Sequence, residues 1–448
     1  MNSSLDEICQ ALLATARTSG AEAADVIAIR SASVDVDVRG GALEQADRSE
    51  ATDIGLRVFL GRRQAIVSAS DTRPETFSAM AERAIAMARE APEDAHAGLA
   101  DPGQLATTWD VDTLELADPA PEPSPEALQA DAAEAEAAAL AVRGVTQVQA
   151  ASAGYSRTRL HMAASNGFSG GYGRTGRYLS CVAISGIGTG MERDHDSDLR
   201  SYQGDLRSPA EIGATAGQRA AERAGARKPA TGTYPVLFDE RISASLIGHL
   251  LEAANGHAVA RGSSWLQGAL GQPVLPEALS LIEDPHRKRM GGSRPFDGEG
   301  LPTRSRAIVE NGILTGWTLD LATARKLGMA PTGNAARGVS SPPSPTNWNL
   351  ALTEGAQSRD DLLRAMGTGL LVTSMIGSTI NPNTGDYSRG ASGFWVENGQ
   401  IAYPVNECTV AGNLRDMLRR IVPANDARSY LSRVVPSLLI EGMTLAGG

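Results

Sequence analysis

Cysteine, histidine and aromatic residues are scarce in this chain of 448 residues. It has three cysteines (Cys9, Cys181 and Cys408), six histidines and only 4% aromatic residues. The cysteines are odd in number, far apart and without a CxxC pair, which argues against a disulfide framework and against a zinc ribbon. This usage fits a reducing compartment, and we expect a cytoplasmic protein.

Long hydrophobic runs and clustered positive charge are missing as well. No run approaches the roughly 18 apolar residues that span a bilayer, and Asp6 and Glu7 precede the first apolar stretch, which argues against a signal peptide. The net charge of −11 disfavours nucleic acid as a partner, because neutralising phosphates requires clustered Lys and Arg. The longest basic cluster, residues 286–289, is expected to be a solvated loop, with anion binding as the alternative.

The length and the 42% of hydrophobic residues predict two or three domains with buried cores. Apolar spacing predicts a helix over 5–17, and Pro74 begins a second helix that reaches about Arg89. Between them, valines at 34, 36 and 38 alternate with charged residues, which is typical of half-buried strands. Turns of a strand meander are expected at Gly40-Gly41 and Gly61-Arg62.

The middle of the chain repeats this order. A Pro-rich acidic linker (117–128) leads into a helix over 126–142, and strands follow from Val145 to Asp205. We expect these strands to be separated at Asn166-Gly167 and at Gly170-Gly171, and a further helix from Pro209 to about Gly225. Runs of strands followed by helices predict an α+β fold.

A change in composition places the main boundary near residue 230. We expect an α+β domain over 1–110, a middle segment of the same N-terminal half over 120–228, and a β-rich domain over 230–448 that carries a helix near its start. Asn-Gly pairs in 309–312 and 396–399 predict two hairpins, since both turn residues must tolerate positive φ. The Ser/Pro tract 340–345 between them is expected to be an exposed loop.

The segment 384–399, TGDYSRGASGFWVENG, closely resembles the signature block of the PmbA/TldE family. Further stretches resemble the same family in the same order, so the resemblance covers essentially the whole chain. These stretches are Met191–Asp194, Pro295–Asp297 with Glu299-Gly300, Ala324–Gly328, Tyr403–Val405, Ala411–Leu414 and Leu438–Gly447.

The resemblance implies a subunit that pairs with a related protein, TldD, in a hollow peptidase acting on unfolded peptides and on modified-peptide precursors. In that family TldD holds the zinc, with two His of an H-E-x-x-x-H helix and a Cys near the C-terminus. The matching helix here includes residues 247–253, with Gly248 and Ala253 where the His ligands would stand, and residues 421–435 contain no Cys. The resemblance therefore implies no catalytic residues and no cofactor in this chain, zinc in the partner, and a heterodimer; it leaves open whether the chain forms a homodimer when the partner is missing.

Read without the family, His249, Glu252 and His257 suggest a metal site, because His and carboxylate are zinc ligands. In one continuous helix the two His would be about 12 Å apart along the axis, too far to share an ion. If the helix ended at Asn255-Gly256, His257 could fold back towards His249, so the hypothesis of an autonomous metallopeptidase stays open. A homodimeric scaffold without proteolytic activity is the third hypothesis.

No nucleophile is evident, because G-x-S-x-G is absent and Cys408 has no His nearby in sequence. His161 remains a free candidate, and the glycines of 167–176 do not form a nucleotide-binding loop. His195 stands among Arg193 and the aspartates at 194, 196 and 198, which favours a surface charge cluster over an acid–base site.

Asp386, Tyr387 and Arg389 are the residues that we single out for contact with a partner or a peptide. Neighbouring glycines would let them approach a second backbone, and the guanidinium of Arg389 offers five donors to carboxylates or carbonyls. The alternative is a buried Asp386–Arg389 ion pair that only shapes the loop.

Overall fold

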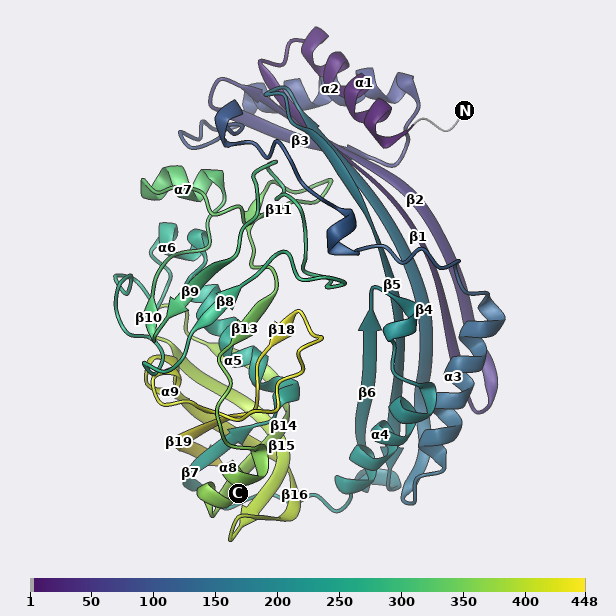
Figure 1. The fold of residues 1–448 in the computed structure, drawn as a ribbon, viewed down its shortest axis with the longest axis vertical. Coiled ribbons are helices and arrows are strands. Elements are labelled where there is room, and N and C mark those ends of the chain that lie inside the picture. Colours follow the sequence, from purple (N-terminus) through teal and green to yellow (C-terminus); the bar gives the residue numbers. More distant parts are fainter. Residues whose placement is uncertain (1–3, 448) are drawn as a thin grey trace.

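A computed structural model describes residues 4–447, which form two halves that face each other (Figure 1). The N-terminal half is built on one antiparallel sheet with the strand order β3-β2-β1-β4-β5-β6. Its strands are β1 Ala23–Arg39, β2 Ala42–Leu60, β3 Arg63–Ala69, β4 Val145–Ala164, β5 Ser169–Ser185 and β6 Glu192–Arg200. Because β1 pairs with both β2 and β4, the chain before the Pro-rich linker and the chain after it share this sheet.

Two helix pairs cover this sheet and make two separate cores. Helices α1 Leu5–Thr18 and α2 Pro74–Glu90 pack on one end, and α3 Pro125–Leu140 and α4 Pro209–Glu222 pack on the other. A capping box between Ser4 and Glu7 begins α1, and a proline occupies the first turn of each of the other three helices. The expected helices and the buried alternating valines of β1 are thus confirmed.

One expected strand break is wrong. Asn166-Gly167 does lie in the turn between β4 and β5, but Gly170 and Gly171 lie inside β5, paired with Met162 and His161. A Cβ on Gly170 would come within 2.7 Å of the Trp109 ring, so this glycine serves close packing rather than a turn. The turn between β5 and β6 is formed by 186–190 instead.

The C-terminal half contains a small closed barrel. Its strands follow the order β16-β15-β14-β7-β19, and β16 also pairs with β19, which closes the ring. They are β7 Gly232–Phe238, β14 Gly369–Ile380, β15 Asp386–Glu397, β16 Gln400–Asn413 and β19 Leu438–Ala446, with β17 Val422–Pro423 attached to β19. Helix α5 Glu240–Ala253 packs its apolar face into the same core. The predicted α+β class with a β-rich C-terminal half is confirmed.

A second, smaller sheet lies on the barrel side, with the order β10-β9-β8-β13-β18. Its strands are β8 Leu281–Glu283, β9 Arg306–Glu310, β10 Ile313–Leu314, β13 Leu350–Leu352 and β18 Arg433–Val434. The short helices of this half are α6 Gly256–Arg261, α7 Leu321–Leu327, α8 Arg359–Met366 and α9 Leu414–Leu418.

Both Asn-Gly hairpins are confirmed, between β9 and β10 and between β15 and β16. Both turn residues have positive φ in each case, 48° and 79° at Asn311-Gly312 and 52° and 75° at Asn398-Gly399. The Ser/Pro tract is only partly an exposed loop, because Pro343 and Pro345 are buried. Strand β12 Ser344–Pro345 pairs with β11 Ala335–Ala336, so the apolar proline rings are packed against protein.

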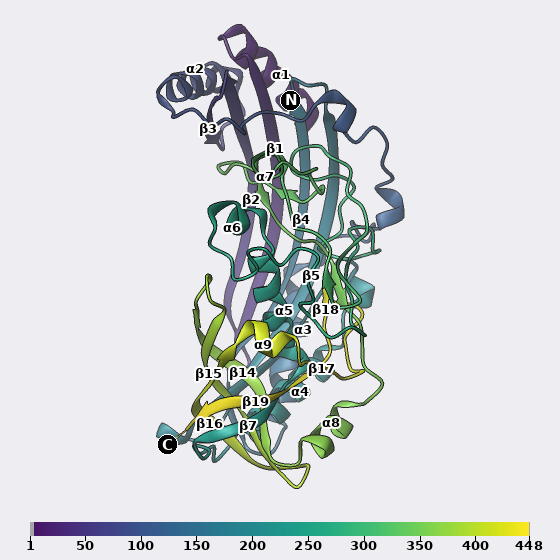
Figure 2. The same ribbon diagram turned by 90° about the vertical axis from the view of Figure 1, so that its left-hand side faces the viewer.

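Seen from the side, the C-terminal half lies in front of the long sheet (Figure 2), and side-chain contacts join the two halves at several places. Near one end, Trp109, Phe168 and Tyr172 surround Phe296 of the C-terminal half, with ring centroids 5.0–5.5 Å from it. Nearby, Asp25 of β1 is buried between Arg57 and Arg337. None of the helices within residues 4–447 combines the length and the apolar character needed to cross a bilayer.

The basic cluster 286–289 lies in a turn, as expected, and His286 and Lys288 are exposed, but its cations also bond to other segments. Arg287 donates to the carbonyl of Leu431 at 3.0 Å, and Lys288 and Arg289 pair with Glu115 at 2.9 and 2.7 Å. Arg287, Lys288 and Arg289 each bond to a distant segment, and Glu115, just before the Pro-rich linker, is thereby held against the C-terminal half.

Candidate functional site

Helix α5 carries the residues that were candidates for a metal site. Asp239 caps its N-terminus, and its C-terminal turn presents His249 and Glu252. His249 is buried, its Nδ1 lies 3.4 Å from a carboxylate oxygen of Glu252, and its ring meets the ring of Tyr387 edge to face at 5.9 Å. Burial lowers the pKa of His249, the hydrogen bond and charge of Glu252 oppose this shift in part, and the positive charge of Arg389 adds to it. The imidazole is therefore neutral at physiological pH.

His257 does not join this pair, although the helix does end as required. Asn255 caps the short helix α6, and this break turns His257 towards Asp320, with 3.8 Å between Nε2 and the carboxylate. His257 lines a different cavity from His249 and Glu252. The three residues therefore do not fit a shared zinc ion, and within 4–447 no group of three or more His, Cys, Asp or Glu side chains has the arrangement of a metal site.

A cavity of about 390 Å³ opens beside the end of α5. Its wall includes His249, Glu252, Arg261 and Trp265, together with Ile380 at the end of β14. This mixture of an apolar ring, a neutral imidazole and opposite charges can bind polar and apolar parts of a peptide but offers no activated nucleophile. Burial raises the pKa of Cys408 to about 11, and of Cys9 and Cys181 to about 12, so the thiols are protonated and unreactive.

Asp386, Tyr387 and Arg389 begin strand β15, next to this cavity, and they do not form one cluster. Asp386 is exposed and accepts hydrogen bonds from Thr384 at 2.7 Å and Asn413 at 3.0 Å, which lower its pKa. Tyr387 is buried and packs on His249. Arg389 donates from Nε to the carbonyl of Gly377 at 2.7 Å.

The alternative of a buried Asp386–Arg389 pair is therefore wrong. Residues three apart on a strand point to opposite faces, so Asp386 reaches solvent while Arg389 shares a face with Tyr387. The half-buried guanidinium of Arg389 makes one hydrogen bond to the protein backbone, which leaves donors for a further acceptor. The contact of these three residues with a partner or a peptide stays a prediction.

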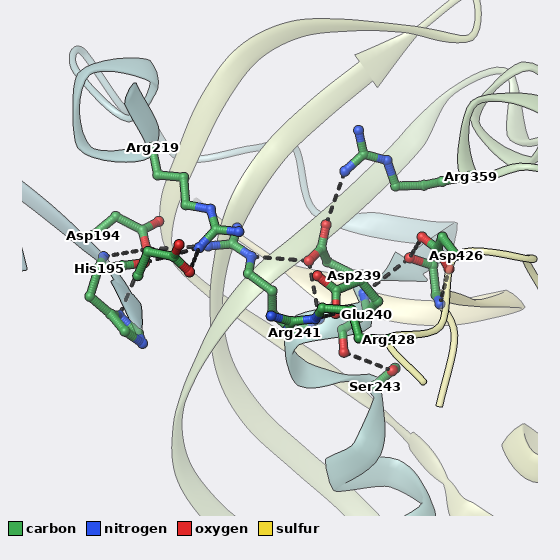
Figure 3. A network of polar contacts seen from close by, with 12 residues as sticks. Asp194, His195, Arg219, Asp239, Glu240, Arg241, Ser243, Arg359, Asp426 and Arg428 are labelled. Atoms are coloured by element: carbon green, nitrogen blue, oxygen red, sulfur yellow. Dashed lines mark hydrogen bonds and ion pairs between the residues drawn. The ribbon is translucent and has the colours of Figure 1, made fainter. Parts of the chain in front are cut away.

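The sequence interpretation missed a polar network that joins the two halves (Figure 3). Asp194, Asp196 and Asp198 of β6 are buried, although His195 between them is exposed, so the expected surface charge cluster is wrong for the carboxylates. Asp194 accepts from Arg241 of α5 at 3.2 Å, and Arg241 also donates to Asp239 at 3.0 Å. The signal was present in the period-two spacing of the aspartates, which places all three on one face of a strand.

Further members extend the network within the C-terminal half. Arg359 pairs with Asp239 at 3.2 Å, and Arg428 donates to Glu240 at 2.6 Å. His161, the other histidine to which the sequence assigned no role, lies 3.1 Å from Asp6 and 2.9 Å from Ser169, and burial lowers its pKa. It lies at the sheet end covered by α1, and the cavity beside α5 does not include it.

Comparisons with known proteins agree with this arrangement along the whole chain. The PmbA/TldA metallopeptidase domain 1 model matches residues 24–88, the central domain model 118–227 and the C-terminal domain model 231–447. Metalloprotease PmbA of Escherichia coli O157:H7 is 36% identical over 436 residues, which are 97% of this chain and 94% of that protein. The chain belongs to the PmbA/TldD family.

Further similar proteins also match almost the whole chain. The Metalloprotease PmbA homolog of Haemophilus influenzae is 34% identical over 96% of this chain and 93% of its own length. A crystal structure from Bacteroides thetaiotaomicron, described as a candidate modulator of DNA gyrase, has a TM-score of 0.90 at 27% identity and covers 99% of this chain and 98% of that one. TldE of Thermococcus kodakarensis shares the fold, with a TM-score of 0.84 at 21% identity over 98% and 99% of the two chains.

Proposed function

We propose that this chain is the non-catalytic, metal-free subunit of a TldD/TldE-type heterodimeric metallopeptidase. The cytoplasmic complex degrades unfolded peptides and processes modified-peptide precursors, with zinc held by the TldD-type partner. The arrangement around α5 carries the proposal. Gly248 and Ala253 stand where the family resemblance puts the two His of the partner's motif, and the neighbouring His249 packs on Tyr387 instead of meeting a second ligand.

The residues of β15 support a role beside the cavity at α5. Strand β15 begins next to this cavity with the exposed Asp386, the buried Tyr387 that packs on the lining residue His249, and the half-buried Arg389. An extended peptide or a strand of the partner would find hydrogen-bonding groups there without any bond-breaking group. The complex, rather than this subunit, would then carry the activity.

Co-expression with the TldD-type protein of the same genome tests the proposal. We expect the two chains to co-purify, unfolded peptides to be cleaved by the complex and by neither chain alone, and zinc to follow the partner. A complex in which the His residues of the partner's H-E-x-x-x-H motif are replaced is the inactive control.

Two outcomes would contradict the proposal in different ways. About one equivalent of tightly held zinc on this chain alone, lost in His249→Ala, together with peptidase activity, would indicate an autonomous enzyme built on His249, Glu252 and His257. A stable homodimer that ignores the TldD-type chain and cleaves nothing would indicate a scaffold.

A further inference from the structure

A second cavity, of about 510 Å³, lies between the two halves and is separate from the one beside α5. Strands β4, β5 and β6 with α4 form one wall, and residues 289–291, 428–432 and the start of α5 form the other. Its lining includes two aspartates and six arginines. These are Asp196, Asp198, Arg174, Arg200, Arg219, Arg241, Arg289 and Arg428.

The two aspartates of the lining are already neutralised. Asp196 accepts from Arg207 and Arg219, both at 2.8 Å, and its side chain is 3% exposed. Asp198 accepts from Arg200 at 2.8 Å and is 1% exposed. The carboxylates that pair with the other arginines, such as Asp239 and Glu240, lie outside the lining. The charge that faces the cavity is therefore that of the guanidinium groups.

Several donors on these arginines have no partner within residues 4–447. Arg200 uses only Nε, for Asp198, while its guanidinium carbon lies 3.7 Å from the centre of the Tyr430 ring. Stacking of this kind fixes the plane of a guanidinium and leaves its in-plane N–H groups available. Arg219 uses one terminal nitrogen, for Asp196 and the carbonyl of His195, and its second terminal nitrogen has no acceptor in the described part of the chain.

We propose that this cavity binds a carboxylate of an extended peptide, through the free guanidinium edges of Arg200 and Arg219. Two held guanidinium groups match the planar, two-oxygen shape of a carboxylate and can donate to both oxygens. A polyphosphate fits less well, because the lining retains two aspartates and the chain has a net charge of −11. That the ligand is a peptide rests on the proposed function, whereas the recognition of a carboxylate rests on the cavity alone.

The carboxylate can come from a peptide C-terminus or from an acidic side chain, and the test separates these sources. Calorimetric titration of the purified chain would use four N-acetylated hexapeptides, with a free or amidated C-terminus and with Glu or Gln at one position. We expect the peptide with both carboxylates to bind at least tenfold more tightly than the peptide with neither. If amidation of the C-terminus weakens binding, the C-terminal carboxylate is the ligand; if the change from Glu to Gln weakens it, the side-chain carboxylate is the ligand.

Replacing the two arginines tests the site directly. Arg200→Gln/Arg219→Gln should remove the preference for acidic peptides, while leaving the weak binding of the neutral peptide unchanged. The variant should fold, because Arg207 lies within 4 Å of both Asp196 and Asp198 and still neutralises them. A thermal melt of the variant would check that it is folded. The control variant Arg48→Gln/Arg73→Gln also removes two positive charges, but from exposed positions outside the cavity, and should keep the preference for acidic peptides.

Equal binding of acidic and neutral peptides, no binding of either, or an equal loss in the exposed control variant would overturn the proposal. None of these measurements uses the TldD-type chain. A failure to pair with that chain would therefore contradict the proposed function and leave the carboxylate site standing. Pairing without any preference for acidic peptides would contradict the carboxylate site and leave the proposed function standing.

Discussion

At the scale of single residues, Arg389 illustrates how a partner decides what a charged side chain contributes. Its sequence neighbour Asp386 suggested an ion pair, but the strand places the two on opposite faces, and Arg389 bonds a backbone carbonyl instead. One such hydrogen bond from a charged group contributes about 1–3 kcal/mol, whereas breaking a buried ion pair costs about 3–5 kcal/mol. The stability of a variant therefore reports which contact exists.

We predict that Arg389→Ala lowers the free energy of unfolding by about 1–3 kcal/mol, which is less than the loss of a buried ion pair would cost. The same variant should lower the peptidase activity of the reconstituted complex several-fold, because donors beside the cavity at α5 are lost. Denaturant titration and peptide cleavage measure the two effects. Arg415→Ala, at an exposed position on α9, is the matched control and should change neither. Full activity in Arg389→Ala would make Arg389 an ordinary structural residue.

At the scale of elements, short-range patterns predicted most of what formed. The 3.6-residue spacing in α1, the alternating valines in β1 and the two Asn-Gly turns each depend on neighbours a few residues away, and each is present. The candidate site was less predictable. The burial of Asp194 depends on Arg241, which is 47 positions along the chain and in the other half, so no local pattern contains that contact.

The turn of the β15–β16 hairpin provides a test at this scale. Gly399 has φ of 75°, and a Cβ there would lie 2.8 Å from Cα of Arg364 on α8. We predict that Gly399→Ala lowers the free energy of unfolding by roughly 2–4 kcal/mol, from left-handed backbone strain plus overpacking. Gly103→Ala, where a Cβ meets nothing within 4 Å and φ is not positive, should stay within about 0.5 kcal/mol. Equal effects in chemical denaturation would contradict the assignment of this turn.

At the scale of the whole molecule, a group of buried charges lies where the halves meet. Burial raises the pKa of Asp297 to about 6, and burial together with the neighbouring Asp297 raises the pKa of Glu299 to about 8. Arg57 of β2 acts in the opposite direction on Glu299 across the interface. A carboxyl whose pKa is raised by folding binds a proton in the folded state, so its contribution to stability declines as pH rises.

We therefore predict that the free energy of unfolding decreases between about pH 4.5 and pH 8 through Glu299. Glu299→Gln should reduce that decrease by roughly 2–4 kcal/mol, because the amide is never ionised and its oxygen can still accept from the backbone N–H of Leu321. Denaturant titrations at a series of pH values measure it. Glu134→Gln, exposed on α3, should leave the pH profile as in the parent chain. An unchanged slope in Glu299→Gln would contradict the prediction.

The central position of β1 in its sheet has a consequence for biosynthesis. Its partner β2 follows directly, but β4, which pairs with the other edge of β1 from Asp25 to Val38, begins only at Val145. At a translation rate of about 5–20 residues per second, that edge stays unpaired for roughly 5–25 s after β1 has been made. Each newly made copy thus passes through a stage with an open strand edge, and this stretch of the nascent chain is where a ribosome-associated chaperone would protect it from pairing with another copy.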